Sequence, residues 1–133
     1  MTIRPGIYPT LQYDDAPAAI AFLETAFGFT RKDVFEDGEG GIAHAQLVLD
    51  GNLIMVSSSR ANIYGIATPA KRGGVTGSIS VTLADPAAHY ARAVAAGADI
   101  ISPLSDKEYG GASYDVRDIG GHVWTFGSYD PWA

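Results

Sequence analysis

The chain has 133 residues, about the length of one domain, and 47% of them are hydrophobic, which is enough for a packed core. Fifteen acidic residues against nine basic ones give a net charge of −6, which disfavours nucleic acid and anionic membranes as partners and favours a neutral or cationic ligand. The chain has no Cys, so disulfides and thiolate metal sites are excluded. No apolar run reaches the length of a membrane span, and Met1–Pro9 lacks the apolar stretch of a signal peptide, so we expect a single cytoplasmic domain over residues 1–133.

The first predicted unit covers residues 7–58 and begins with a strand at Ile7–Tyr13. Asp15 precedes an Ala-Pro pair, which is typical of a helix start because the carboxylate accepts free backbone N–H groups. An apolar stripe at helical spacing predicts a helix from Ala16 to Phe27, and Gly28 is suited to end it. Three strand-like runs follow, at Phe29–Glu36, Gly41–Asp50 and Leu53–Ser58.

The second predicted unit, residues 77–129, repeats this order about seventy residues later. A strand at Ser78–Leu83 leads to Asp85, then to a helix from Pro86 to Ala96 that ends at Gly97. The strands that follow are Asp99–Ser102, Ser113–Asp118 and His122–Ser128. The sequence therefore predicts an α+β fold of two tandem βαβββ modules, which form a curved mixed sheet around a pocket and are joined by a linker at residues 59–76.

Alternation along the predicted strands separates an apolar face from a polar one. Aliphatic side chains occupy one parity of Ser78–Leu83 and hydroxyl side chains the other, and Gly41–Asp50 sets Ala and Leu against His44 and Gln46. The apolar parities are expected to pack beneath the helices. The polar parities carry no Lys or Glu, which favours a ligand-sized hollow, although a solvent-facing surface is the alternative.

Tyr114 is a further candidate for this hollow. A regular hairpin closed by the turn Asp118–Gly121 places Arg117 opposite His122 and therefore Tyr114 opposite Thr125. This register directs the phenol into the hollow, where it can stack on a ligand and donate a hydrogen bond.

Three segments together resemble a known family: PTLQYDDAPAAIAFLETAFGF (residues 9–29), GGIAHAQLVLDGNLIMVSS (40–58) and YDVRDIGGHVWTFGSYDPW (114–132). They are similar to the vicinal-oxygen-chelate superfamily, which contains glyoxalase I, extradiol dioxygenases, fosfomycin-resistance and bleomycin-resistance proteins, and in particular to its glyoxalase-like or PhnB-like branch. Ile119 departs from the family pattern, which usually has Pro there. The resemblance implies a homodimer whose pocket lies between modules of one or two chains.

The resemblance also implies four positions for metal ligands, which map here to Tyr8, Met55, Ser78 and Thr125. Divalent cations in such sites prefer imidazole and carboxylate donors, and none of these residues supplies one. We therefore expect no metal cofactor, with a relocated divalent metal as the alternative.

These observations predict a metal-independent protein that binds and sequesters a small molecule. The alternatives are a lyase, isomerase or dioxygenase of the same superfamily with a relocated divalent metal, acid–base chemistry on His44 with Tyr114, and an interaction module without a ligand. The predicted ligand-binding residues are Tyr8, Thr10, Gln12, His44, Gln46, Met55, Ser78, Ser80, Tyr114 and Thr125.

Overall fold

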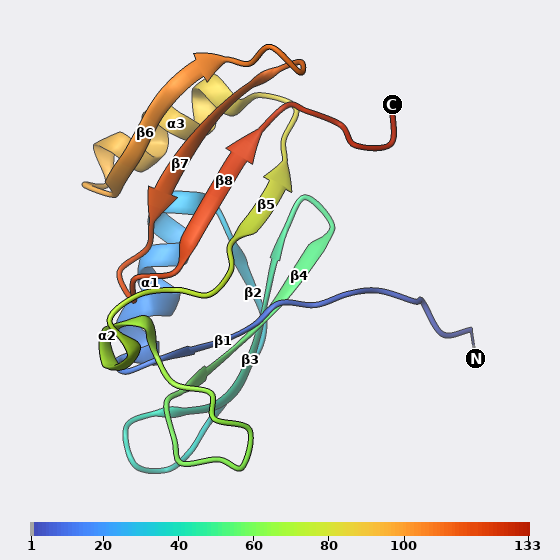
Figure 1. Ribbon diagram of the computed structural model, residues 1–133. Coiled ribbons are helices and arrows are strands. Elements are labelled where there is room, and N and C mark those ends of the chain that lie inside the picture. The colour runs from blue at the N-terminus through green and yellow to red at the C-terminus, as the bar shows by residue number, and fades with distance from the viewer. Residues whose placement is uncertain (1) are drawn as a thin grey trace.

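The computed structural model describes residues 2–133 and confirms the predicted α+β class, with the same order of elements in each half of the chain (Figure 1). Module 1 contains β1 (Thr10–Tyr13), α1 (Ala16–Phe27), β2 (Thr30–Glu36), β3 (Ile42–Leu49) and β4 (Asn52–Ser58). Module 2 contains β5 (Ile79–Thr82), α3 (Pro86–Ala95), β6 (Asp99–Asp106), β7 (Ala112–Arg117) and β8 (Val123–Gly127). The short helix α2 (Pro69–Arg72), which the sequence did not predict, lies between them. Among residues 2–133, no helix is long and apolar enough to span a membrane.

Both long helices begin as their sequences predict. The side chains of Asp15 and Asp85 each accept a hydrogen bond at 3.1 Å, from the backbone N–H of Ala18 and Ala88 respectively. Gly28 ends α1 in the left-handed conformation, at φ 81°, which a residue with a side chain adopts only at a cost. Local sequence therefore fixes where α1 starts and stops.

Each module forms its own four-stranded sheet. The strand orders are β1-β4-β3-β2 and β5-β8-β7-β6, with the first and last strands of each module parallel. Thr10 pairs with Met55 in sheet 1, and Ser80 pairs with Thr125 in sheet 2, so each position in the second pair lies 70 residues after its counterpart. The internal repeat is therefore kept in strand register as well as in element order.

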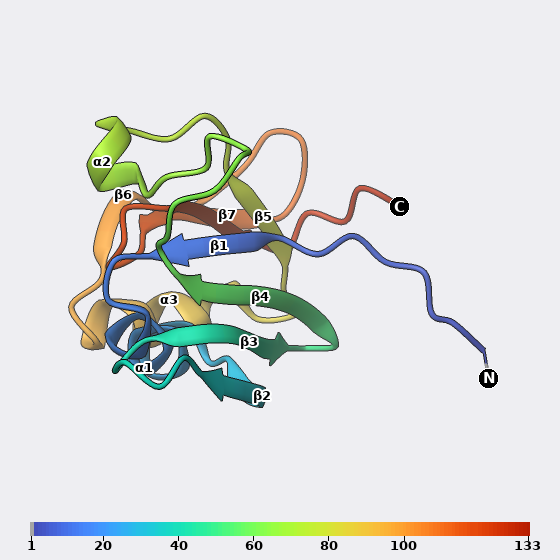
Figure 2. The same cartoon turned by 90° about the horizontal axis from the view of Figure 1, so that it is seen from below.

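Two strands, β1 and β6, differ in length from the strands that the sequence predicts. Strand β1 begins only at Thr10, because the preceding segment contains two prolines and extends away from the body as an N-terminal arm, residues 2–9 (Figures 1 and 2). Strand β6 continues to Asp106 through Pro103, which is tolerated because β6 is the outer strand of its sheet.

One hydrophobic core joins the two modules. Helix α1 contacts α3, and the ring of Phe27 lies 5.6 Å from that of Trp124 and 4.8 Å from that of Phe126. The apolar parities of the strands face this core, as predicted, with Ala45 and Leu47 fully buried. Because both sheets turn their apolar faces to the helices, their polar faces point away from the core.

A buried carboxylate also links the modules. Asp118, in the turn between β7 and β8, accepts hydrogen bonds from the Tyr13 hydroxyl of β1 at 2.5 Å and from Trp124 Nε1 at 3.0 Å. Its other oxygen accepts the backbone N–H groups of Gly120 and His122. Burial, together with the Asp118 charge, raises the pKa of Tyr13 well above its ordinary value, so the phenol stays protonated and continues to donate.

Candidate functional site

The polar face of sheet 1 brings together half of the predicted binding residues, namely Thr10, Gln12, His44, Gln46 and Met55. Phe35 pairs with His44 across β2 and β3, and Gln12 pairs with Ser57 across β1 and β4. His44 and Ser57 each adjoin the pair formed by Ala45 and Val56, so the four side chains form one row across the sheet. A second row contains Asp33, Gln46, Met55 and Thr10. We call these two rows the outer face of sheet 1.

His44 lies at the centre of this face. Its Nε2 is 3.3 Å from the amide nitrogen of Gln46, which donates to it, so the neutral ring carries its proton on Nδ1. The ring also lies roughly parallel to that of Phe35, at 21° with centroids 6.3 Å apart. Phe35 is 56% exposed, an unusual setting for a large aromatic side chain on an edge strand. The pair therefore presents flat aromatic surface on the open side of the sheet.

Gln12 carries the face's unsatisfied polar atom. Its Oε1 is buried, and no group among residues 2–133 donates a hydrogen bond to it. A buried acceptor without a donor costs about 1–3 kcal/mol, so such atoms usually have a ligand or a water as their partner. The backbone oxygen of Gln12, by contrast, accepts from His122 Nε2 at 3.0 Å. The backbone of Gln12 is thus anchored, while its buried amide oxygen has no donor among residues 2–133.

The polar face of sheet 2 has a different chemistry. Thr125 donates to Asp115 Oδ1 at 2.6 Å across β8 and β7, and Ser80 pairs with Thr125 from β5. Ser78 and Ser80 are exposed, and Ser78 lies just before the strand. Asp115, which the sequence analysis missed, is therefore the carboxylate nearest the predicted residues of module 2.

Tyr114 does not face Thr125, and the predicted hairpin register is wrong by one residue. Asp115 is the partner of Thr125, while Tyr114 pairs with Phe126 and is fully buried in the core. A one-residue shift moves every side chain of a strand to the other face. The cause is the loop, in which Asp118 pairs with His122 so that only three residues turn the chain.

Tyr114 instead completes a buried contact with α3. Its hydroxyl lies 2.6 Å from His89 Nδ1, and His89 Nε2 lies 2.8 Å from the backbone oxygen of Phe27. The carbonyl requires a proton on Nε2, so Tyr114 donates to an unprotonated Nδ1. Burial lowers the pKa of His89 and raises that of Tyr114, which keeps both groups neutral.

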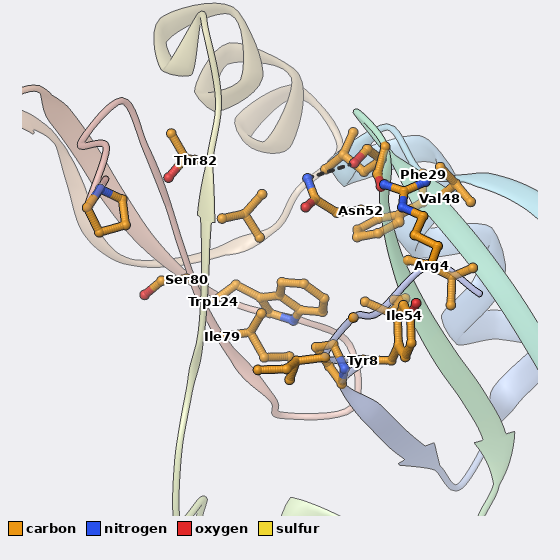
Figure 3. A pocket seen from close by; sticks show the side chains of 18 of the residues that line it. Arg4, Tyr8, Phe29, Val48, Asn52, Ile54, Ile79, Ser80, Thr82 and Trp124 are labelled. Atoms are coloured by element: carbon orange, nitrogen blue, oxygen red, sulfur yellow. Dashed lines mark hydrogen bonds between the residues drawn. The ribbon is translucent and has the colours of Figure 1, made fainter. Parts of the chain in front are cut away.

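A pocket of about 810 Å³ lies elsewhere, between the N-terminal arm, the start of β4 and strand β5 (Figure 3). Trp124 and Ile79 approach it from module 2, and Phe29 and Ile54 approach it from module 1, while polar groups such as Asn52 also line it, so its walls are mixed in character. Tyr8 and Ser80 are the two predicted residues that line it. Apart from Ser80, the predicted residues on the polar strand faces are therefore not gathered into this pocket.

The four positions that the family resemblance assigns to a metal do not fit a divalent cation. A phenol, a thioether and two hydroxyls, from Tyr8, Met55, Ser78 and Thr125, are poor ligands, and the Thr125 hydroxyl already donates to Asp115. Within residues 2–133, no three His, Asp or Glu side chains are grouped so that they could hold a metal ion. These four side chains therefore differ from the imidazole and carboxylate ligands that a divalent metal of this family would need.

Comparison with protein families agrees with the fold. The family model described as the Glyoxalase/Bleomycin resistance protein/Dioxygenase superfamily matches residues 7–126 of this chain. The uncharacterized protein Mb0911c of Mycobacterium bovis is 31% identical over 129 residues, which cover 96% of this chain and 85% of that protein.

Solved structures show the same architecture. The crystal structure of TioX from Micromonospora sp. ML1 has a TM-score of 0.74 and 33% identity, and the match covers 92% of this chain and 94% of TioX. The fosfomycin resistance protein FosX of Listeria monocytogenes, crystallised with Mn(II) and sulfate, has a TM-score of 0.68 and 15% identity, covering 98% and 97% of the two chains. The FosX match is a similarity of fold.

Proposed function

The chain belongs to the Glyoxalase/Bleomycin resistance protein/Dioxygenase superfamily, and from that premise we propose that it binds and sequesters a small molecule without a metal ion. The buried, unpartnered Oε1 of Gln12 on the outer face of sheet 1 is the observation that carries this proposal. A bound molecule with a hydrogen-bond donor would satisfy it. A cytoplasmic location remains a prediction.

The composition of the face supports binding more than chemistry. Gln12, Gln46 and Thr10 offer uncharged polar groups, while Met55 and Phe35 offer adaptable or flat apolar surface. Binding sites commonly combine such apolar area with a few polar groups that set orientation. A nucleophile or a general base would need an activating partner, whereas the neighbour of His44 here is the Gln46 amide.

The same proposal includes a homodimer, because one chain leaves large apolar side chains uncovered. Ile7 of the N-terminal arm is 98% exposed and Trp132 near the C-terminus is 96% exposed, and both line the pocket beside strand β5. Strand β5 is also an edge strand with free backbone groups. A second copy that covers this region would bury the apolar surface that the monomer leaves in water.

Two measurements test this function. A thermal-shift screen against a small-molecule library should find compounds that raise the melting temperature, because ligands that bind the native state stabilise it by mass action. Elemental analysis of protein purified without chelators should find no stoichiometric metal. The proposal fails if no compound shifts the transition, or if zinc, nickel, manganese or iron copurifies at one ion per chain. Light scattering tests the dimer separately.

Metal-assisted lyase, isomerase or dioxygenase activity is the second candidate, and Asp115 is the observation that favours it. Its carboxylate lies beside Thr125, at one of the positions that the resemblance assigns to a ligand. Calorimetric titration with Mn(II) and Zn(II) should show binding that Asp115→Asn abolishes if this alternative holds. Heat changes equal in the parent and the variant would exclude a site at Asp115.

A further inference from the structure

We infer that the pocket beside strand β5 is filled by a second copy of this chain, whose Trp132 enters it while the pocket of that copy receives Trp132 in return. This inference rests on the homodimer of the proposed function, since it names the segment and the hollow through which two copies meet. It is carried by an exposed tryptophan on an ordered segment, an open pocket beside it, and an acceptor in that pocket that lacks a donor.

The segment after β8, residues 128–133, which we call the tail, presents Trp132 in a fixed position. Thr82 of β5 donates to the backbone oxygen of Tyr129 at 2.9 Å and anchors the base of the tail. Asp130 Oδ1 accepts the backbone N–H of Trp132 at 2.8 Å, which closes a turn. The tail is therefore ordered, yet Trp132 is 96% exposed and makes almost no contact with its own chain. A side chain presented in this way loses little entropy when a partner buries it.

The pocket offers an apolar seat for an indole. Its volume is about 810 Å³, and the buried side chains of Phe29 and Trp124 form its closed end. Leu53 of β4 and Ile79 and Val81 of β5 line it and are only half-buried. An aromatic side chain that covers these groups removes apolar surface of both copies from water.

Asn52 supplies the polar contact that would orient the indole. Its amide nitrogen donates to the backbone oxygens of Leu49 and Asp50, at 3.1 and 3.3 Å, so the orientation of the amide is fixed. Its Oδ1 faces the pocket (Figure 3), and no group among residues 2–133 donates to it. An indole N–H can only donate, so the partner's Trp132 fits this acceptor.

The tail and the pocket are placed for a reciprocal exchange. The N-terminal arm and the tail extend from the same side of the molecule (Figures 1 and 2), and both line the pocket that lies between them. A two-fold axis brings identical surfaces of two copies together, so a protrusion and a hollow on one surface can be exchanged. The assembly closes at two copies, because each tail then occupies one pocket.

The charges around the pocket favour the same partner. Arg4 on the arm and Lys32 on β2 line the pocket from module 1, whereas Asp130 lines it from the tail. Arg4 makes one long contact, 3.4 Å to the backbone oxygen of Gly51, so its guanidinium keeps donors for another group. A tail that enters from the second copy brings a carboxylate toward these basic groups.

The exchange buries enough area for a stable dimer. A buried aromatic side chain removes about 150–250 Å² from water, so the two Trp132 side chains together remove roughly 300–500 Å². The pocket walls lose a similar area, and Ile7 on each arm, which is 98% exposed, adds to the total. The sum approaches the lower bound of about 1,200 Å² for a specific interface.

Substitution of Trp132 tests the exchange directly. Trp132→Ala should raise the dimer dissociation constant at least about thirtyfold in analytical ultracentrifugation, because it removes a central aromatic anchor from each copy. Tyr64→Ala is the matched control, since it removes an aromatic side chain that is 77% exposed and does not line the pocket. Its dissociation constant should equal that of the parent.

A mixture of two variants tests where Trp132 goes. Asn52→Phe fills the pocket with a side chain of the same copy and keeps the tail, whereas Trp132→Ala keeps the pocket open and lacks the indole. Each variant alone should dissociate more readily than the parent. An equimolar mixture should associate more tightly than either variant, because one Trp132 then meets one open pocket.

Fluorescence gives a readout that needs no pocket variant, so it decides the matter if Asn52→Phe does not fold. The chain has two tryptophans, and Trp124 is already fully buried. Dilution of the parent through its dimer transition should therefore shift the emission to longer wavelength and increase quenching by acrylamide. Trp132→Phe should show neither change.

The possible failures are distinct. If Trp132→Ala and Tyr64→Ala dimerise equally, if the mixture is no tighter than its components, or if dilution leaves the emission unchanged, Trp132 does not enter the partner's pocket. The inference is then overturned while the dimer stands. If the parent is a monomer at every concentration, the homodimer of the proposed function fails as well. Small-molecule binding is decided separately by the thermal-shift screen.

Discussion

Leu23 of α1 and Ala93 of α3 occupy equivalent places in the two modules, and both are fully buried. The side chain in module 1 is the larger of the two. The same holds on the outer faces of the sheets, since Gln12 and Met55 of module 1 correspond to Thr82 and Thr125 of module 2. The repeat has kept the strand register, but the bulk is divided between the modules: the larger outer-face side chains lie in module 1, whereas in the core Trp124 and Phe126 of module 2 stand where module 1 has Ile54 and Val56. A shared backbone thus permits one outer face to carry an amide and a thioether while the other carries small hydroxyl groups.

The turns that precede the last strand of each module differ even more. Asp50 and Gly51 both have positive φ, 48° and 78°, and form an exposed two-residue turn in module 1. The corresponding turn of module 2 begins at Asp118, which is buried and holds four donors, including Tyr13 of module 1. The first turn only reverses the chain, whereas the second also fastens the modules together.

Replacing each turn aspartate by asparagine should separate these two roles most strongly. Asp118→Asn places amide hydrogens against donors that have no other acceptor and removes the buried charge they stabilise, so we expect a loss of roughly 3–5 kcal/mol in the free energy of unfolding. Asp50→Asn is the matched change on the surface and should alter it by less than about 0.5 kcal/mol. Urea denaturation measures both, and equal losses would show that the buried network does not join the modules.

Substitutions at the buried positions of α1 and α3 should have the next largest effect on the free energy of unfolding. Leu23→Ala leaves a cavity beneath α1 and should cost about 2–5 kcal/mol, whereas the inverse change, Ala93→Leu, should overpack α3 and cost about 1–3 kcal/mol. Val94→Ala, at a half-exposed position on α3, is the control and should have little effect. An unfolding free energy unchanged by Leu23→Ala would mean that α1 does not bury this stripe.

Much of this architecture follows from local sequence signals. The caps at Asp15 and Gly28 predicted the bounds of α1 correctly, because they satisfy backbone groups through neighbouring residues alone. The alternation along β3 also predicted which side chains face the core. Both signals act over a few residues, so no knowledge of the rest of the fold is required.

The site depends on contacts that such signals do not contain. The register of Tyr114 was predicted wrongly because Asp118 is drawn into the core by Tyr13 and Trp124, residues whose proximity only the tertiary structure reveals. Phe35 was missed because register shifts in β2 obscure its parity, although it pairs with His44. An aromatic residue in the mostly charged run of residues 30–36 was the signal that the sequence offered.

The half-buried histidine between the modules, His89, should make stability depend on pH. Burial lowers the pKa of His89 in the folded state, so below its ordinary pKa of about 6.5 the unfolded chain takes up a proton that the folded protein does not. The stabilisation is therefore complete above pH 6.5 and is lost as the pH falls. His89→Gln should be less stable at pH 7 but lose less between pH 7 and pH 5.5. If the free energies of unfolding of the parent and His89→Gln fell in parallel with pH, His89 would not be the cause of the pH dependence.

Removing the surface ion pairs should give the smallest difference in stability between the two modules. Arg31 donates through two nitrogens to Glu24 Oε1 in module 1, at 3.1 and 2.9 Å, whereas Arg117 makes one contact of 3.1 Å with Asp99 in module 2. All four side chains are substantially exposed, so solvent screens both pairs and each contributes about 0.2–1 kcal/mol. Arg31→Ala should therefore cost slightly more than Arg117→Ala, and 0.5 M NaCl should reduce the difference. A larger loss from Arg117→Ala that persists in salt would indicate that its aliphatic stem packs on β6, so that packing rather than charge determines its contribution.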